Sequence, residues 1–538
     1  MQNFVTIIVV LTLLVGLLAV GDRYKLPTPI LLVVSGLAIG FIPGMTAIDL
    51  EPEVIFLFFL PPILYDAAAT TSWHDFKAEF KPITTLAIVL VIFTTGSVAV
   101  ASYFLIPGFT WPLAFVLGAI VSPPDAVAAT NITKGLGLNK KVITILEGES
   151  LVNDASALIA YRFAIAAIGS GTFILWKAGI GFILLVLGGI VAGVLIGYAF
   201  VLIHKKILNN SIISTALTLL TPFVAYLAAE YLHVSGVLSV VCAGLVISWR
   251  APDVFSFQTR IRHRAVWDTI IFLMNGIVFI LIGLQLRSIL DDLEEYSVSA
   301  LWLYGSVVSV VTILVRIFWV FSAAFLSKAV SGQPSNHDQY DGNTWKNVVI
   351  VAWTGTRGVV SLATALALPF AIGGNALPHR SLILFLAFVV IFVTLVIQGL
   401  SLPLLLRLLN VKQHDNVDKD ERNLPISIAN SVLDFIDQDL ADKITETTRE
   451  RVRKKYVEMI DSFSEKEKRE GTPGASGTKM SSGQELRQAQ AEINKFQRKL
   501  LIGYHQSGEF NPEAIREFEQ KLDLEELLFN RTQKKKKN

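Results

Sequence analysis

The sequence is poor in cysteine and, over most of its length, in charge. One cysteine, Cys242, stands among 538 residues, so a disulfide within the chain and a cysteine-based metal cluster are excluded. Charged residues make up 17% of the chain, against about 25% in ordinary soluble domains, and the segment 412–538 holds more than half of them. With 53% hydrophobic residues and a mean hydropathy of +0.56, the composition predicts a multi-span membrane protein.

Several functional motifs are missing as well. No Gly-x-x-x-x-Gly-Lys-Ser/Thr phosphate loop occurs, which disfavours an ATP-driven pump. The Tyr65-Asp66 pair lacks the Gly-x-Gly-Asp partner that an intramembrane aspartyl protease needs, because that chemistry requires two acids sharing a proton. The first apolar segment has no basic region before it and no small-x-small cleavage site after it, so we expect it to remain as a span. We expect that the protein is not an enzyme, uses no cofactor and has no nucleic-acid partner.

Thirteen segments are long and apolar enough to be candidate spans, since crossing a bilayer takes about 20 residues. The candidates are residues 3–20, 28–43, 53–70, 82–106, 112–131, 141–168, 174–203, 211–229, 235–249, 265–286, 298–327, 347–369 and 380–408. The second and ninth are short and rich in small residues.

The loop charges predict the orientation. One set of alternate connections carries fifteen Lys and Arg residues and the other set carries three, which places the N-terminus outside and the tail in the cytoplasm. Spans one to six and eight to thirteen then have opposite orientations, as in inverted-repeat secondary transporters. We expect an all-α polytopic membrane protein with two inverted six-helix repeats over residues 1–410, and a helical cytoplasmic tail over 411–538.

Two spans are predicted to be interrupted at equivalent positions of the two halves. Span five contains Pro123-Pro124, which removes two backbone donors and stops a regular helix. The corresponding span of the second half contains Gly355-Thr356-Arg357-Gly358. Because unwound backbone inside a membrane is tolerated only where its polar groups are satisfied, the matching breaks indicate crossed discontinuous helices around a binding site.

Span six carries the candidate ligands. Glu147, Ser150 and Asp154 fall at i, i+3 and i+7 along one helical stripe, and Glu149 and Asn153 form the adjacent stripe. Ionisable groups at this depth are costly, at about 2.5–3.5 kcal/mol each, and so call for a function. Carboxylate, amide and hydroxyl oxygens on one face are the ligands that a hard monovalent cation needs.

Asp154 is the residue on which we expect the chemistry to depend. Its surroundings tune its proton affinity, so that the carboxylate binds a proton and a cation in competition. Asp125, at the break of span five, adds a second carboxylate. Asp66, after Pro61-Pro62, is a peripheral ligand, an entrance acid or a simple interfacial carboxylate. We expect Arg357 to pair with Glu149, since a buried arginine needs an acid.

The chain resembles the monovalent cation/proton antiporter-1 family, which includes bacterial NhaP-type exchangers and animal sodium/proton exchangers. The likeness covers about residues 1–410. It is carried by Pro61-Pro62-Ile63-Leu64-Tyr65-Asp66, Ser122-Pro123-Pro124-Asp125, Glu147-Gly148-Glu149-Ser150-Leu151-Val152-Asn153-Asp154 and Arg357-Gly358.

This resemblance implies a thirteen-span homodimer in the plasma (inner) membrane, contacting lipid. Spans four to six and eleven to thirteen would form a mobile, elevator-type core, and exchange of one Na⁺ (or Li⁺ or K⁺) for one H⁺ would be electroneutral. The implied roles are an ion- and proton-binding carboxylate at Asp154, supporting ligands at Asn153, Ser150 and Asp125, a third acid at Asp66, and a structural ion pair between Glu149 and Arg357.

One departure from the family pattern leaves the cation open. Relatives usually have Thr-Asp-Pro at the span-five break, where this chain has Pro124-Asp125-Ala126. A K⁺-selective cation/proton antiporter is therefore an alternative, and a monovalent cation channel is another. In the tail, residues 426–470 and 484–530 have roughly helical apolar spacing on either side of a linker-like segment 471–477, and these helices could pack on each other, on the membrane domain or across a dimer.

Overall fold

The structure is a computed structural model that describes most of the chain. The described residues are 12–19, 21, 23, 28–40, 51–125, 140–170, 175–207, 210–331, 344–409, 415–441, 443–464, 485–507, 510, 514–515 and 517–523. Contacts divide the chain into two compact units. Unit 1 comprises Met1–Val254 with Arg262–Gln413, and unit 2 comprises Phe255–Ile261 with His414–Asn538.

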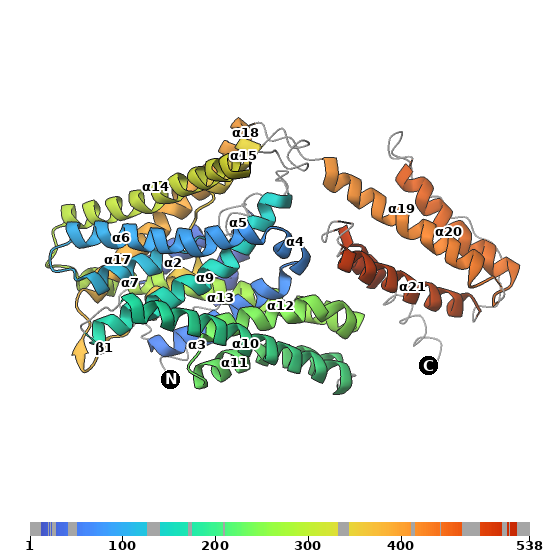
Figure 1. The fold of residues 1–538 in the computed structure, drawn as a ribbon, viewed down its shortest axis with the longest axis horizontal. Coiled ribbons are helices and arrows are strands. Elements are labelled where there is room, and N and C mark those ends of the chain that lie inside the picture. Colours follow the sequence, from blue (N-terminus) through green and yellow to red (C-terminus); the bar gives the residue numbers. More distant parts are fainter. Residues whose placement is uncertain are drawn as a thin grey trace. The chain divides into compact units, whose positions relative to one another are not determined.

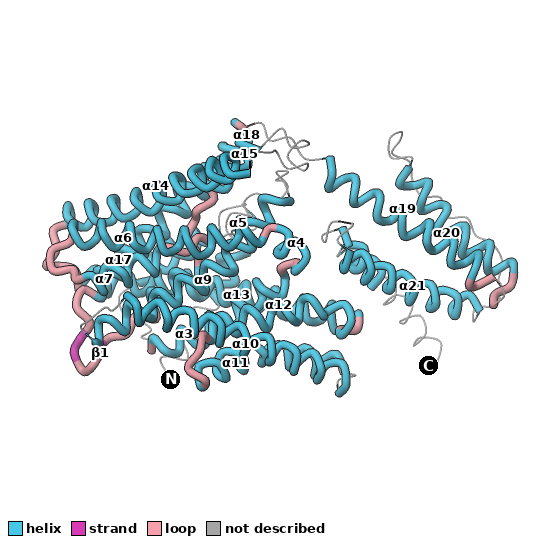
Figure 2. The backbone as a smooth tube through the Cα atoms, in the orientation of Figure 1, coloured by secondary structure: helices cyan, strands magenta, loops and turns pink. Residues whose placement is uncertain are grey.

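Unit 1 is built almost entirely from helices (Figures 1 and 2). Its elements, with residues 12–19 also helical, are α2 (Thr28–Gly40), α3 (Pro52–Thr70), α4 (Trp73–Ala78), α5 (Phe80–Thr84), η1 (Thr85–Leu90), α6 (Val91–Leu105), α7 (Trp111–Val121), α9 (Lys140–Ser170), α10 (Leu175–Ile207), α11 (Ser211–Tyr231), α12 (Gly236–Val254), α13 (Phe257–Asp291, beginning in unit 2), α14 (Val298–Ser331), α15 (Thr344–Trp353), α16 (Val359–Leu366), β1 (Ala371–Ile372), β2 (Asn375–Ala376), α17 (Arg380–Val393), η3 (Thr394–Gly399) and α18 (Leu400–Leu408). The two strands pair antiparallel.

Among the described residues, eight helices are long and apolar enough to cross a membrane. Three shorter apolar helices, Leu31–Gly40, Trp111–Val121 and Gly236–Ala251, accompany them. They correspond to the expected second, fifth and ninth spans. Residues 3–11 of the first expected span and 126–131 of the fifth lie outside the described residues. The chain is a helical membrane protein with many spans, and the number thirteen stays a prediction.

Two of the long helices contain a wide, π-helical turn. The first runs through α5, η1 and α6, and the second through α17, η3 and α18. A π-helical turn shifts the hydrogen-bonding pattern by one residue and often lies at a functional site. Thr394, the first residue of η3, hydrogen-bonds with one of the interrupted segments described below.

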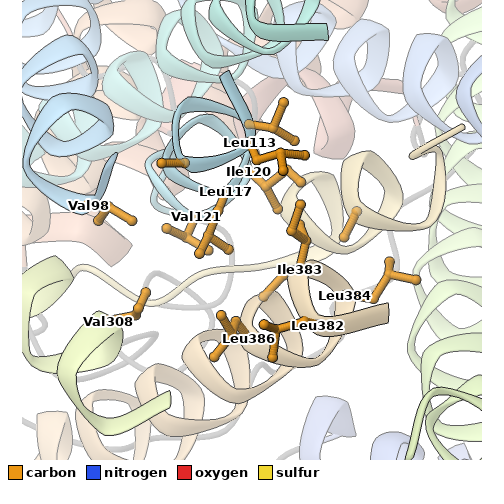
Figure 3. Packing of buried hydrophobic residues seen from close by; sticks show 14 of the residues in the cluster. Val98, Leu113, Leu117, Ile120, Val121, Val308, Leu382, Ile383, Leu384 and Leu386 are labelled. Carbon is orange, nitrogen blue, oxygen red and sulfur yellow. The ribbon is translucent and has the colours of Figure 1, made fainter. Parts of the chain in front are cut away.

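The half-helix α7 is buried among its neighbours. Figure 3 shows Leu117 and Ile120 of α7 packed toward Ile383 and Leu386 of α17, with Val308 of α14 beside them. All five side chains are fully buried. Because lipid is as apolar as leucine, close packing holds such helices together in a membrane. This packing fixes the C-terminal end of α7, where the first interruption begins.

A second group of helices packs around α12. A Cβ at Gly193 of α10 would overlap with the backbone of Ser239 on α12, and one at Gly244 of α12 would overlap with the side chain of Ala68 on α3. The Ser239 hydroxyl donates to the carbonyl of Ala225 on α11 at 2.9 Å. We call α3, α10, α11 and α12 the α12 group. A further set of elements packs mainly on its own members, and we call it the α9 group: α5, η1, α6, α7, α9 and α14 to α18.

Unit 2 has a hydrophobic core of its own. Its helices are α19 (Asp415–Gln438), α20 (Glu446–Ser464) and α21 (Glu485–Ser507). The buried core residues of α19 recur every four residues, which places them on one helix face: Leu424, Ile428, Val432 and Ile436. The rings of Phe435 and Phe496 stack with centroids 4.2 Å apart. The tail helices therefore pack on each other.

Unit 2 also contains a buried acid with two cationic partners. Asp523 is 4% exposed, and its Oδ1 lies 2.8 Å from Nη2 of Arg260 and 2.7 Å from Nη2 of Arg498. Arg260 belongs to the segment Phe255–Ile261. Two guanidinium groups on one carboxylate compensate the loss of its hydration.

Candidate functional site

The second predicted interruption lies wholly within the described residues, and of the first they include the end of α7 and the unwound segment that follows it. The backbones of the two unwound segments are joined by hydrogen bonds. The segment 122–125 follows α7, and the segment 354–358 separates α15 from α16. The N–H of Asp125 donates to the carbonyl of Thr356 at 2.6 Å, and the Thr356 hydroxyl donates to the carbonyl of Asp125 at 3.1 Å. The two unwound segments therefore satisfy part of each other's backbone, as apolar surroundings require.

Arg357 satisfies carbonyls at both interruptions. Its Nε donates at 2.9 Å to the carbonyl of Val121, the last residue of α7, and its Nη1 donates to the carbonyl of Gly355. Its own N–H donates to the Thr394 hydroxyl at 3.1 Å. The side chain is 1% exposed. The last carbonyls of a helix lack partners and carry partial negative charge, so a guanidinium stabilises them well.

Glu149 forms its ion pair with Arg316 of α14. Nη1 of Arg316 lies 2.5 Å from Oε1 of Glu149, and Nη2 lies 3.0 Å from Oε2. Both side chains are 1% exposed, and Arg316 also donates to the carbonyl of Val351. The predicted pair of Glu149 with Arg357 is therefore wrong. Arg357 donates to carbonyls at the interruptions instead, while the planar fork of Arg316 matches the carboxylate in the bidentate geometry.

Asp154 and Asn153 lie side by side in the sequence of α9, close to the first interruption. Asp154 is 8% exposed and Asn153 is fully buried. Nδ2 of Asn153 donates to the carbonyl of Pro124 at 3.2 Å, which ties α9 to the unwound segment. In the part of the chain that the structure describes, Oδ1 of Asn153 has no hydrogen-bond partner. Since buried polar atoms are almost always satisfied, this oxygen is available to a ligand.

The charges around Asp154 favour a cation. Asp154 interacts electrostatically with Asp125 and Glu149, and both interactions are repulsive when the groups are ionised. Arg316 neutralises Glu149, and Asp125 and Asp154 are the other two acids of this group. A bound proton or cation relieves the repulsion between them.

The carboxylate of Asp125 lies against the backbone of Gly358. A Cβ on Gly358 would overlap with the carboxylate, so only glycine fits at this position. Gly358 directly precedes α16, which begins at Val359. The first interruption therefore places its acid beside the N-terminal end of a half-helix, which favours negative charge.

The remaining predicted ligands lie on α9 and α3. Ser150 is half-buried on α9, one turn before Asp154, and Glu147 is exposed there. Asp66 is half-buried on α3, in the α12 group. The binding roles of Ser150 and Asp66 stay predictions.

Sequence reasoning missed three residues that build the site: Thr356, Thr394 and Arg316. Thr356 lies inside the predicted break, but its spacing alone does not show that it bonds to Asp125. Thr394 lies in a uniformly apolar stretch and carries no local signal. Arg316 lies within the expected span 298–327, and the need of every buried charge for a partner was a usable signal there.

Comparisons with known proteins identify relatives over most of the chain. Residues 9–408 match the family model described as sodium/hydrogen exchanger, transmembrane. An uncharacterized Na⁺/H⁺ exchanger of Mycobacterium tuberculosis (strain ATCC 25618 / H37Rv) is 31% identical over 517 residues, which cover 94% of this chain and 92% of the relative. The sodium, potassium, lithium and rubidium/H⁺ antiporter of Bacillus subtilis (strain 168) is 30% identical over 425 residues, which cover 75% of this chain and 62% of the relative.

A solved structure has the same fold. The sodium proton antiporter MjNhaP1 from Methanocaldococcus jannaschii at pH 8 matches with a TM-score of 0.60 and 21% sequence identity. The match covers 77% of this chain and 100% of the other chain.

Breaking the Glu149–Arg316 pair on one side should destabilise the protein strongly. We expect Glu149→Gln and Arg316→Gln each to cost about 3–5 kcal/mol, because each leaves a buried charge without its partner. The double variant should cost much less than the sum of the two. Thermal unfolding of the purified protein in detergent measures all three, and additive losses would show that the two side chains do not form one unit.

Gly358→Ala tests the packing at the second interruption. The added methyl overlaps with the Asp125 carboxylate, and overpacking of this kind costs about 1–3 kcal/mol. Gly96→Ala on α6 is the matched control, since a Cβ there meets nothing within 4 Å and alanine favours helix. The same unfolding assay should show a loss for the first variant and none for the second; equal behaviour would contradict the close contact.

Proposed function

This chain belongs to the sodium/hydrogen exchanger family, and we propose that it exchanges Na⁺ for H⁺ at Asp154. It is a membrane transporter rather than an enzyme, and its cargo is monovalent cations and protons. The observation that carries the proposed site is the buried Asp154 next to Asn153, whose Oδ1 lacks a partner among the described residues.

The site chemistry is a competition for one carboxylate. In one state Asp154 binds a proton. In the other it binds Na⁺, together with oxygens from Asn153, Ser150 and Asp125. Oxygen ligands suit a hard cation because they replace its hydration shell. The bond from Asn153 Nδ2 to Pro124 directs the amide oxygen away from that carbonyl and supports this assignment.

Alternating access requires that the occupied site reach both sides of the membrane. We infer thirteen spans in two inverted repeats, with spans four to six and eleven to thirteen moving as an elevator-type core. The crossing of the two interruptions at Asp125 and Thr356 supports this arrangement, because interrupted helices at equivalent positions mark the binding site of inverted-repeat transporters. We also infer a homodimer in the plasma (inner) membrane, with the N-terminus outside and the tail in the cytoplasm.

Exchange of one Na⁺ for one H⁺ is electroneutral, and this is the stoichiometry we propose. Li⁺ and K⁺ are further candidate substrates. The name of the Bacillus subtilis relative lists sodium, potassium, lithium and rubidium, which favours K⁺/H⁺ exchange as the second candidate function. The sequence Pro124-Asp125-Ala126 at the first interruption is where we expect cation selectivity to differ from that of other members.

Neutralising Asp154 should abolish exchange. We expect Asp154→Asn, reconstituted in vesicles with an internal pH dye, to show no proton movement when Na⁺, Li⁺ or K⁺ is added, because an amide releases no proton. Asp268→Asn is the control, since Asp268 is 71% exposed on α13, and it should retain activity. Proton release evoked by cations in Asp154→Asn would contradict the assignment.

The competition predicts a specific pH dependence. Where protons outcompete the cation, each unit of decrease in pH should raise the apparent KM for Na⁺ about tenfold, by reciprocal linkage at one site. The maximal rate at saturating Na⁺ should change far less. Initial rates over a Na⁺ series at several pH values test this, and an unchanged KM with a falling maximal rate would indicate separate proton and cation sites.

A further inference from the structure

A second charged cluster lies about two helical turns beyond Asp154 on α9. Nη2 of Arg162 lies 2.8 Å from Oε1 of Glu230 and donates to the hydroxyl of Tyr226 at 2.9 Å. The guanidinium also lies over the ring of Phe56, 5.6 Å from its centroid. Glu230 and Tyr226 belong to α11 and Phe56 belongs to α3. One side chain of α9 thus contacts two helices of the α12 group.

The cluster bridges two sets of helices that otherwise pack mostly within themselves. α9 packs chiefly on α7, η1, α5 and α6, and α11 packs on α12, α10 and α3. The candidate cation ligands Asp154 and Asn153 are on α9. A bond between Arg162 and Glu230 therefore links the element that carries the site to the group that does not.

The exposure of this ion pair differs sharply from that of the other intramembrane pair. Arg162 and Glu230 are 31% and 33% exposed, whereas Glu149 and Arg316 are each 1% exposed. Separating a buried pair leaves bare charges in an apolar medium and is strongly unfavourable. Separating a partly exposed pair is easier where water reaches it, and Glu230 lies at the C-terminal end of α11, next to its last residue. The buried pair lies within the α9 group, and the exposed pair connects the two groups.

Glu230 keeps a partner when Arg162 leaves. The N–H of Gly236, the first residue of α12, donates to Oε1 of Glu230 at 3.3 Å. A Cβ on Gly236 would lie 2.7 Å from the same oxygen, so glycine allows this approach. A helix N-terminus favours a carboxylate. The acid is thus stabilised by its own group of helices whether or not the arginine is bound.

We propose that Arg162 and Glu230 form a reversible tie between the α9 group and the α12 group, closed in one facing of the transport cycle and open in the other. The proposal rests on the proposed function, since a carrier that changes its facing must move α9 against α11. Arg162 is a positioning residue for exchange: it sets the facing of α9 through Glu230.

Cross-linking the tie tests whether it must open. Arg162→Cys and Glu230→Cys are combined with Cys242→Ala, which removes the single native cysteine, and the protein is reconstituted in vesicles. A bifunctional methanethiosulfonate reagent joins the two cysteines, and mass spectrometry gives the extent of joining. We expect Na⁺-driven proton movement to fall in proportion to cross-linking and to return when dithiothreitol cleaves the linker.

The control pair lies within one helix. Arg264→Cys and Asp268→Cys, which replace an i,i+4 ion pair on α13, should cross-link without loss of exchange, because the two positions do not move relative to each other. Full exchange by the completely cross-linked Arg162→Cys/Glu230→Cys protein would overturn the tie alone. If neither the Cys242→Ala parent nor the double-cysteine protein before cross-linking exchanges Na⁺ for H⁺, the proposed function and the tie are both overturned.

Neutral variants separate a facing-dependent tie from a merely structural one. Arg162→Gln, Glu230→Gln and the double variant should each shift the apparent KM for Na⁺ by about fivefold, the size of a modest coupling between states. The double variant should shift it no more than either single one, because all three remove the same bond. A lower yield of folded protein with an unchanged KM would refute the proposal.

Discussion

Interrupting two helices inside a membrane leaves carbonyl oxygens that no water can satisfy, and the rest of this site depends on how they are satisfied. Arg357 satisfies two of them by donating to the last carbonyl of α7 and to the carbonyl of Gly355 in the second interruption. The reciprocal bonds of Asp125 and Thr356 complete it. With both segments fixed in this way, Asn153 reaches the carbonyl of Pro124, and Asp154 comes to lie near Asp125.

The two buried arginines of the site have different partners and therefore different structural roles. Arg316 lies on a continuous helix and faces a carboxylate, so its fork is bidentate. Arg357 lies in an unwound segment and serves backbone carbonyls. The ion pair therefore holds α14 against α9, while the guanidinium of Arg357 holds the two interruptions together.

Much of this arrangement follows from the sequence. Pro123-Pro124 and the glycines around Thr356 predict the two interruptions, because neither pattern sustains a regular helix. The apolar pattern predicts that Asn153 and Asp154 lie on a spanning helix, and they lie on α9. The partner of Glu149 was predicted wrongly as Arg357, because only tertiary packing shows which intramembrane arginine lies beside the acid. The membership of Phe255–Ile261 in unit 2 also depends on tertiary contacts, so no local pattern predicted it.

The surroundings of the two buried arginines bear on how membrane voltage acts on this transporter. Arg316 is balanced by Glu149, and Arg357 keeps its positive charge while it donates to carbonyls, so neither changes its charge in the proposed exchange at Asp154. Carrying one elementary charge across 100 mV involves about 2.3 kcal/mol of electrical work. In the proposed exchange of one Na⁺ for one H⁺, the carboxylate carries the same total charge with either cation, so the electrical work is equal in the two directions. For that proposed exchange, the membrane voltage cancels over a full transport cycle, and the two concentration ratios alone determine where net flux stops.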